Sequence, residues 1–484
     1  MKRLPQNVLW VVGSFLLIGF VFAWGSGCNN ISPTPTEQAN STESPTEKIK
    51  LVYWEKWDHF EAEAMKRLVE DFNASQDRIE VEYVRLVDIR TKTLLAVAGG
   101  RPPDIAGLFP EVLPLYAEKE AILPLDGLME RDNINASRYL PVIFSLCQHE
   151  GHTWGLPTTP TSLALYYNKR LFREAGLDPQ KPPRTLEELQ SMARRITRYN
   201  EDGRIERLGF SPELPRWFRL WWIHWFGGRL WDGEGRMTLD SPEAIAMLEW
   251  VQSFPITFGT ESLQRFHATE GPFNSAQNLF IAGRVGMQLQ GVWMANFIER
   301  NNPNLEWDVA PFPTANSGGH PVTIVNCDVL VIPRGSRHPE EAWEFIRFVQ
   351  MQKNMERLCR DQWKFSPLVQ VSESFYANHP HPRIQMFRTL SESPGAVPAP
   401  RPVIIEEVRE EVYHALDSVW LLQATPHEAA QRAQVRLQGD LEQQLTQWKR
   451  VEKMRRLSWL ELMPAREALE QQSASTLPGE GKLP

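Results

Sequence analysis

Residues 217–228, WFRLWWIHWFGG, gather four tryptophans and two phenylalanines within twelve positions. Flat indole rings can cover the apolar face of a ring-shaped ligand, or they can fill a hydrophobic core. On a helix Trp217, Trp221 and Trp225 would share one row, and apolar residues occupy most of the other rows as well. A helix that is apolar nearly all round is a buried helix, so we expect most of this stretch to form core.

Sequence patterns that carry catalysis or hold cofactors are absent: GxSxG, HExxH, the phosphate-binding GxxxxGK[ST] loop and GxGxxG do not occur. Carboxylates are plentiful, but no pair is marked by its surroundings as catalytic. Cys147, Cys327 and Cys359 stand far apart, without a CxxC or Cys/His metal spacing, which predicts buried free thiols. The sequence therefore predicts no catalytic residue, no metal site and no cofactor.

The bulk composition limits the class of protein. The chain has 484 residues, more than one core usually supports, so two lobes or domains are expected. It carries 52 basic and 60 acidic side chains, a formal net charge of −8. A nucleic-acid-binding protein would normally be basic, so no nucleic-acid partner is expected.

The N-terminal segment has the layout of an export signal: a short basic start precedes an uncharged, mostly apolar run at 8–24. Small residues before Cys28 are similar to the lipobox of bacterial lipoproteins, in which the cysteine is lipidated and becomes the mature N-terminus. The alternative is an uncleaved membrane anchor, for which the run is short. We expect 1–28 to be a lipoprotein-type signal or anchor, 29–48 a Ser/Thr/Pro-rich tether, and the body to lie outside the cytoplasm.

The start of the body alternates strand and helix patterns. IKLVYW (49–54) and, further on, RIEVEYVRL are β-rich, and the segment between them has apolar residues at helical spacing. A second helix near 90–98 and a short strand from Asp104 follow. This order predicts a parallel sheet with helices on its faces. Ligands bind beyond the carboxyl ends of such strands, which singles out the loops after Trp54 and Leu108.

Five segments resemble, in family order, the signature segments of the extracellular solute-binding proteins of sugar ABC importers. The longest, LALYYNKRLFREAGLDPQKPPRTLEELQSMARRIT (163–197), follows the family pattern YYNK-LF-EAGLD-P--T--EL. The others are RPPDIAGLF (101–109), NLFIAGRVGMQLQGVW (278–293), IPRGSRHPEEAWEFIRFV (332–349) and TPHEAAQRAQVRLQGDL (425–441).

The resemblance implies an α/β, two-lobed periplasmic-binding-protein fold, in which each lobe is a mainly parallel sheet flanked by helices and a hinge joins the lobes. Chain crossings are expected in segments rich in Pro, Gly, Ser and Thr, which lie near 157–162, 311–320 and 363–367. Lobe one would then hold 49–160 and 315–362, and lobe two 161–314 and 366–445, followed by a charged C-terminal extension at 446–484.

The resemblance also indicates the binding residues. In the family an aromatic residue some ten positions before a Gly-Gly pair faces the cleft, and Trp217 stands at that distance from Gly227. Trp293 is expected to reach the cleft from a loop after a strand. An indole covers the C–H face of a pyranose, while polar groups satisfy its hydroxyl rim. The rim candidates are Glu55, Lys56, Asp58, Glu111, Asn326 and Asp328.

The implied function is that of a non-enzymatic lipoprotein at the outer face of the cell membrane, which captures a mono- or oligosaccharide and delivers it to the permease subunits of an ABC transporter. Two alternatives stay open. A cluster of basic residues in the cleft, hinted at by Arg216 and Arg219, would favour glycerol phosphate or another anionic solute. An exported carbohydrate-active enzyme would also use tryptophan platforms, with two essential carboxylates about 5–10 Å apart.

Overall fold

The computed structural model describes residues 48–232, 236–315, 319–402, 404–443 and 446. The expected export signal with Cys28, the tether as far as residue 47 and the C-terminal extension from residue 447 lie outside the described residues. None of the described helices combines the length and the apolar character needed to cross a membrane.

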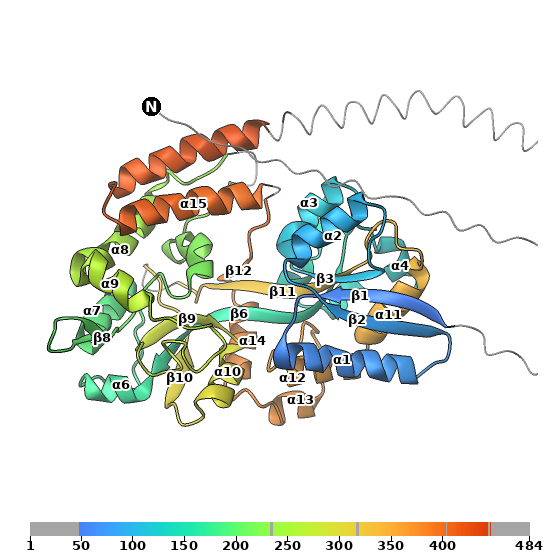
Figure 1. Cartoon of the computed structure of the whole chain (residues 1–484), viewed down its shortest axis with the longest axis horizontal. Helices are drawn as coiled ribbons and strands as arrows, with labels where there is room; N and C mark the ends of the chain where they lie inside the picture. The colour runs from blue at the N-terminus through green and yellow to red at the C-terminus, as the bar shows by residue number, and fades with distance from the viewer. Residues whose placement is uncertain (1–47, 233–235, 316–318, 403, 444–445, 447–484) are drawn as a thin grey trace, which may run out of the picture. The chain divides into compact units, whose positions relative to one another are not determined.

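One eight-stranded sheet runs through the body (Figure 1), in the order β10-β6-β11-β3-β1-β2, with β9 paired to β6 and β12 paired to β11. Its strands are β1 (Ile49–Glu55), β2 (Ile79–Arg85), β3 (Ile105–Leu108), β6 (Leu156–Asn168), β9 (Met287–Gly291), β10 (Trp307–Ala310), β11 (Thr323–Val331) and β12 (Ala396–Pro398). We call the part built on β1, β2 and β3 the first half, and the part around β6, β9 and β10 the second half.

The direction of the strands differs between the halves. β1 pairs in parallel with β2 and with β3, as predicted. By contrast, β6 pairs antiparallel with β9, β10 and β11. The expectation of a mainly parallel sheet in each lobe thus holds for the first half and needs correction for the second, because the chain enters the second half along one long strand and its neighbours run back against it.

That long strand, β6, and its neighbour β11 carry the chain between the halves. β11 pairs with β3 at Val331 and with β12 at Thr323. β6 lies opposite Leu330 at its start and opposite Met287 near its end. The crossing expected near 157–162 is therefore part of a continuous strand instead of a loop. The strand tolerates its two prolines there because a bulge interrupts the β6–β11 ladder at that point.

The helices surround this sheet, and Figure 1 shows α2 and α3 on one side of β1–β3 and α1 on the other. In chain order the longer ones are α1 (His59–Ala74), α2 (Ile89–Ala98), α7 (Leu186–Ile196), α8 (Pro242–Phe258), α9 (Thr260–His267), α10 (Met294–Asn301), α11 (Pro339–Val349), α12 (Gln352–Asp361), α14 (Ile384–Glu392) and α15 (Ile405–Trp420). The shorter elements are α3 (Leu113–Glu118), α4 (Asp126–Arg131), α5 (Pro141–Ser145), α6 (Lys169–Glu174), α13 (Glu373–Ala377), the 3₁₀ turns η1 (Pro110–Val112) and η2 (Ala136–Arg138), and the strands β4 (Gln148–His149), β5 (His152–Thr153), β7 (Arg198–Tyr199) and β8 (Ile205–Arg207).

Two helices begin at residues whose side chains cap them. The Ser241 hydroxyl accepts a hydrogen bond from the Ala244 amide at the start of α8. Thr425 and Glu428 exchange bonds in both directions, with N···O distances of 3.0 and 3.3 Å, ahead of a helix at residues 426–443. This last helix lies beside α15 in Figure 1, and Arg436 contacts Glu411 across the pair at 3.2 Å.

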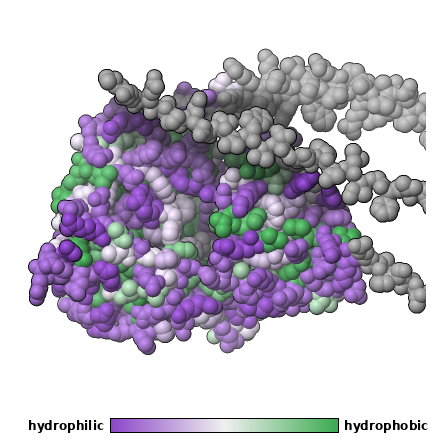
Figure 2. Space-filling view, viewed as in Figure 1, coloured by the Kyte–Doolittle hydropathy of each residue, from purple (hydrophilic) through white to green (hydrophobic). Residues whose placement is uncertain are grey.

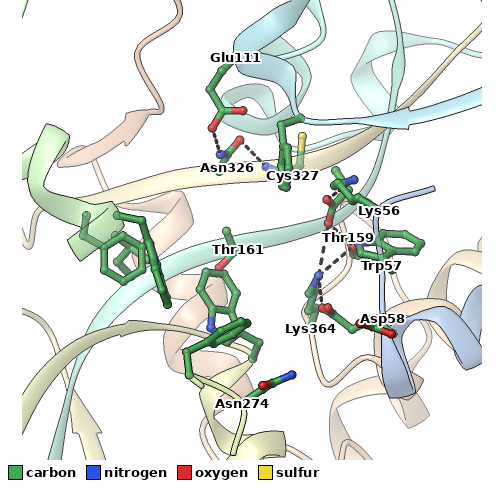
Figure 3. A pocket seen from close by; sticks show the side chains of 18 of the residues that line it. Lys56, Trp57, Asp58, Glu111, Thr159, Thr161, Asn274, Asn326, Cys327 and Lys364 are labelled. Atoms are coloured by element: carbon green, nitrogen blue, oxygen red, sulfur yellow. Dashed lines mark hydrogen bonds and ion pairs between the residues drawn. The ribbon is translucent and has the colours of Figure 1, made fainter. Parts of the chain in front are cut away.

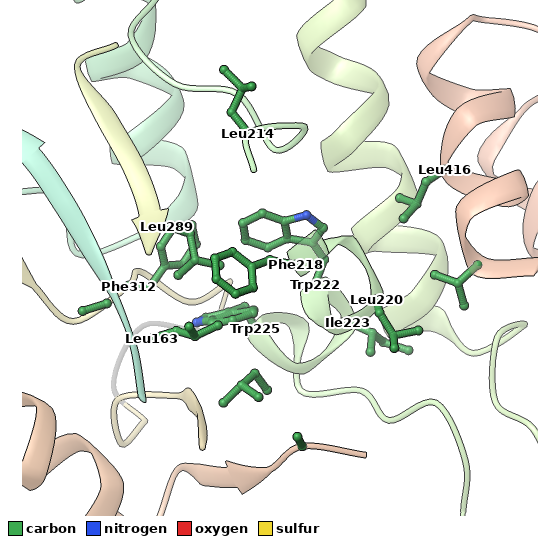
Figure 4. Close-up of a cluster of buried hydrophobic side chains, with 14 of the residues drawn as sticks. Leu163, Leu214, Phe218, Leu220, Trp222, Ile223, Trp225, Leu289, Phe312 and Leu416 are labelled. Atoms are coloured by element: carbon green, nitrogen blue, oxygen red, sulfur yellow. The ribbon is translucent and has the colours of Figure 1, made fainter. Parts of the chain in front are cut away.

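The tryptophan-rich stretch is a 3₁₀ helix, η3 (Arg216–Phe226), and not the α-helix predicted from its pattern. A 3₁₀ helix has three residues per turn, so its rows join residues three apart. Trp222 and Trp225 therefore lie on one buried row and pack with Phe312, with ring centroids 5.3–5.4 Å apart (Figure 4). Trp221, expected on the same helical row as Trp225, is only half-buried.

Replacing Trp225 with alanine should destabilise the fold by about 3–5 kcal/mol, because this side chain is 1% exposed and its loss leaves a cavity among other aromatic rings. The matched control is Tyr199→Ala, which removes an aromatic side chain that is 48% exposed and should change the free energy of unfolding by less than about 0.5 kcal/mol. Urea denaturation measures both. A cost below 1 kcal/mol for Trp225→Ala would show that the row is not core.

Candidate functional site

A cavity of about 740 Å³ lies where the two halves meet. The surface face in Figure 2 is mostly hydrophilic, whereas the cavity is lined by many aromatic side chains. The lining comes from the segments after β1 and β3, from the end of β2 and from α2, from β6 and β11, and from η3, α10 and α15. The two loops that the sequence singled out, after Trp54 and after Leu108, both contribute to it.

The charged side of the cavity centres on Asp328 of β11, and Figure 3 shows its partners Lys56, Thr159 and Lys364. Its carboxylate receives Lys56 at 2.8 Å and Lys364 at 3.3 Å, and it accepts a hydrogen bond from the Thr159 hydroxyl at 2.9 Å. Lys364 also pairs with Glu61 at 2.8 Å. Asp328 and both lysines are buried or nearly so, and these contacts tie together the end of β1, the start of α1, β6, β11 and the segment after α12.

The pKa values reflect this mutual pairing. Burial opposes ionisation of Asp328, but Lys56 and Lys364 outweigh it and lower the pKa of this carboxyl to about 2. Burial alone would lower the pKa of Lys56 and of Lys364, yet the carboxylates around each lysine raise it instead. All three groups are therefore charged at neutral pH.

Glu55 was expected to line the cleft, and the structure corrects this. Glu55 is 0% exposed and does not line the cavity. Its carboxylate forms an ion pair with Lys56 at 3.1 Å and accepts a hydrogen bond from the Tyr53 hydroxyl at 2.6 Å. Side chains alternate along a strand, so Glu55 shares the core face of β1 with Leu51 and Tyr53. Gly107 on β3 leaves the space that the carboxylate occupies. Glu55 thus supports Lys56 from behind.

The other polar candidates all lie on the cavity wall, where Asp58 and Asn326 are already engaged. Asp58 accepts a bond from the backbone of His59 at the start of α1 and pairs with Arg85 at 2.7 Å. Asn326 donates to one oxygen of Glu111 at 2.6 Å. Burial raises the pKa of Glu111, against the hydrogen bonds that lower it.

The opposite side of the cavity is aromatic. Trp217, Phe218 and Trp221 reach it from η3, and Trp293 reaches it from the residue that precedes α10. The Phe218 and Trp293 rings are stacked, with centroids 6.4 Å apart and planes at 30°. Trp217 is 41% exposed and stands edge-on to Phe273 at 5.1 Å. The structure therefore brings both predicted tryptophans to one wall, opposite the charged cluster.

Some buried polar atoms on the lining have no partner among the described residues: the second oxygen of Glu111 and the indole N–H groups of Trp221 and Trp293. A buried polar atom without a partner is costly. Glu111, Trp221 and Trp293 thus carry one buried acceptor and two buried donors whose hydrogen bonds no described protein group supplies.

Several lining residues were missed from the sequence. Trp57 and Phe109 flank the Lys56 ammonium, which lies 5.2 and 4.5 Å from their ring centroids. Both directly follow strands, a signal that could have found them. Lys364, Arg409 and Tyr413 lie in the segment after α12 and on α15, where no local pattern distinguishes a cavity residue from a surface one.

A possible cation-binding group lies outside the cavity lining. Glu118, His149 and Glu150 carry oxygen and nitrogen atoms within 4.8 Å of one another, and His149 pairs with Glu118 at 3.0 Å. Nothing in the described cavity lining is arranged in this way.

The pairing of Asp328 makes stability depend on pH. Its pKa is about 2 in the folded protein against an ordinary 3.8, so the ionised form contributes about 2 kcal/mol that is present above pH 3.8 and lost as the pH falls through 2. Asp328→Asn should therefore be less stable than the wild type at pH 6, and the difference should shrink as the pH falls from 4 towards 2. Urea unfolding across this range measures it, and a difference independent of pH would contradict the assignment.

Curated relatives share moderate sequence identity with the chain. The maltotriose-binding protein of Pyrococcus abyssi is 23% identical over 303 residues, which are 62% of each chain. The arabinooligosaccharide-binding protein of Halalkalibacterium halodurans is 20% identical over 415 residues, 81% of this chain and 90% of that one. The aligned region thus spans less than two thirds of the Pyrococcus protein and most of the Halalkalibacterium protein.

Solved structures share the fold. CpMnBP1 with mannobiose bound superposes with a TM-score of 0.74 at 25% identity, over 80% of this chain and 99% of that one. The MalE domain of Bdellovibrio bacteriovorus bound to maltotriose gives a TM-score of 0.67 at 17% identity. The two-lobed binding-protein fold predicted from the sequence is thereby confirmed. The sequence model of the family of bacterial extracellular solute-binding proteins matches residues 60–356, which is more than half of the chain. The protein therefore belongs to this family.

Proposed function

We propose that the protein captures a neutral oligosaccharide in the cavity between its lobes and delivers it to the permease subunits of an ABC transporter. One observation carries the proposal: the same cavity is lined by aromatic and by polar side chains. Trp217 and Trp293 belong to its aromatic wall, and Glu111 and Asn326 to its polar wall. A pyranose has an apolar face and a hydroxyl rim, so it needs both kinds of wall.

The charges of the cavity favour a neutral ligand over an anionic one. Lys56 and Lys364 share Asp328, and Arg85 pairs with Asp58. Arg90 and Arg409 both contact Glu406. Each of these cations already has a carboxylate partner, so an anion would have to displace one. The basic residues that the sequence offered for an anion site, Arg216 and Arg219, contact Asp417, and neither lines the cavity.

The size of the cavity and the relatives support more than one sugar unit. A volume of about 740 Å³ lies in the upper part of the range for small-ligand pockets, roughly 300–1,000 Å³. The relatives named above bind maltotriose, arabinooligosaccharide and mannobiose, as their names state. A relative named for sn-glycerol 3-phosphate is 28% identical, but over only 31% of this chain. We therefore propose a di- or trisaccharide and no catalytic role.

We further propose that the lobes follow the predicted ranges, with 49–160 and 315–362 in lobe one and 161–314 and 366–445 in lobe two, and that lipid on Cys28 anchors the protein outside the cell membrane. A neutral ligand trapped between such lobes reaches a membrane permease by diffusion of the anchored body, which the tether at 29–48 allows.

The lipid anchor predicts that the wild-type protein incorporates a fatty-acid label in its bacterial host and that Cys28→Ala does not. Each buried methylene adds about 0.8 kcal/mol to membrane affinity, so the variant should also leave the membrane fraction. An unlabelled wild type that retains residues 8–24 after processing would identify an anchor helix instead.

Removing a stacking ring should weaken sugar binding without unfolding the protein. We expect Trp217→Ala, Trp293→Ala and Trp221→Ala each to raise the dissociation constant for the bound oligosaccharide at least tenfold, about 1.4 kcal/mol. Trp231→Ala is the matched control, because this tryptophan is 37% exposed and lies outside the cavity lining.

Calorimetric titration with mannotriose, maltotriose and arabinotriose, together with melting curves, provides the measurement. If none of these sugars binds the wild type, or if all four tryptophan variants bind equally well, the proposed site is refuted.

A further inference from the structure

Glu406, at the start of α15, bridges two arginines that come from different halves of the body. Its carboxylate contacts Arg90 of α2 at 2.9 Å and Arg409, one turn further along α15, through its other oxygen. α2 packs against β3 of the first half, and α15 packs against α8 and η3 of the second. This ion pair therefore joins the two halves at residues 316 positions apart in the chain.

The bridge stands at the edge of the ligand cavity. Arg90 and Arg409 line the cavity, whereas Glu406 does not. Figure 1 shows α2 and α15 on the upper side of the body, and α1 and α10 on the lower side. On the lower side the halves meet through Phe60 of α1 and Phe297 of α10, with ring centroids 5.7 Å apart. One edge of the cleft is thus closed by an ion pair. The other is closed by the Phe60 ring, which contacts Phe297 and has the Arg300 guanidinium 4.8 Å from its centroid.

We propose that Glu406 is an electrostatic latch, which holds the two lobes together over a bound ligand and slows its release. This inference rests on the proposed function for its effect on the ligand, but the latch itself is a property of the protein alone. The side chains of Arg90 and Glu406 are 38% and 54% exposed, so salt reaches the pair and screens it. The apolar contact of Phe60 and Phe297 has no such dependence.

Removing the Glu406 carboxylate should open this edge of the cavity by more than the loss of a single ion pair would. In the wild type the Glu406 carboxylate lies between the Arg90 and Arg409 guanidinium groups and compensates their charges. Without it, the two positive groups repel each other across this edge of the cavity. Glu406→Gln should therefore open the edge more than Arg90→Gln does, and the double variant should return to the level of Arg90→Gln alone. A residue that only supports the fold of α15 would not give this pattern.

Stopped-flow tryptophan fluorescence with the tightest-binding trisaccharide tests the latch. At low salt we expect Glu406→Gln to raise the ligand dissociation rate about two- to fivefold, in line with an exposed ion pair, while the association rate stays the same. The wild-type dissociation rate should rise with salt, and that of Glu406→Gln should not. The control is Glu407→Gln, the exposed neighbour in the same helical turn, which forms no ion pair with any residue that the structure describes.

A second measurement needs no ligand. Spin labels attached to noncanonical keto residues in place of Lys92 and Glu410, both exposed on α2 and α15, report the distance across the edge and leave the native cysteines untouched. Glu406→Gln and high salt should each shift the distances to larger values. If the distances and the dissociation rate match the wild type, the latch is refuted. If no sugar binds but the distances shift, the latch stands and the proposed function fails.

Discussion

Two lysine ammonium groups share one carboxylate, Asp328, at the point where the chain crosses between its halves. Uncompensated charges cannot be buried cheaply, so Lys56, Lys364 and Asp328 must stay within contact of one another. Lys56 follows β1, Asp328 lies on the crossing strand β11, and Thr159 adds a hydrogen bond from the crossing strand β6. This pairing fixes the relative position of these segments, and the remaining walls of the cavity are arranged around it.

The same pairing decides what the cavity can hold. Because the cations on its wall are matched by carboxylates of the protein, the surface left for a ligand is mainly aromatic. The stretch η3 contributes to this division. Trp222 and Trp225 lie in the core, while Trp217 and Trp221 stay at the cavity. One short stretch thus supplies both core and cavity wall.

The sequence predicted the first three strands, because each rests on a local pattern, and the resemblance to the family placed Trp217 at the cavity. It could not separate an α-helix from a 3₁₀ helix in η3, since periods of 3.6 and 3.0 look alike where nearly every position is apolar. Glu55 was misplaced although the alternation of Leu51 and Tyr53 already pointed it to the core. Arg409 and Tyr413 could not be found at all, because the packing of α15 against η3 brings them to the cavity and no local pattern encodes that packing.

We propose that the internal pairing of charges suits this cavity to a neutral sugar. Thermal unfolding in the presence of maltotriose, mannotriose and their phosphorylated counterparts tests this proposal. A neutral ligand at about 100 times its dissociation constant should add roughly 2.7 kcal/mol to the stability and raise the melting temperature, while the phosphorylated sugar at the same concentration should not. Stabilisation by the phosphorylated sugars or by glycerol 3-phosphate, with none by the neutral ones, would contradict the account.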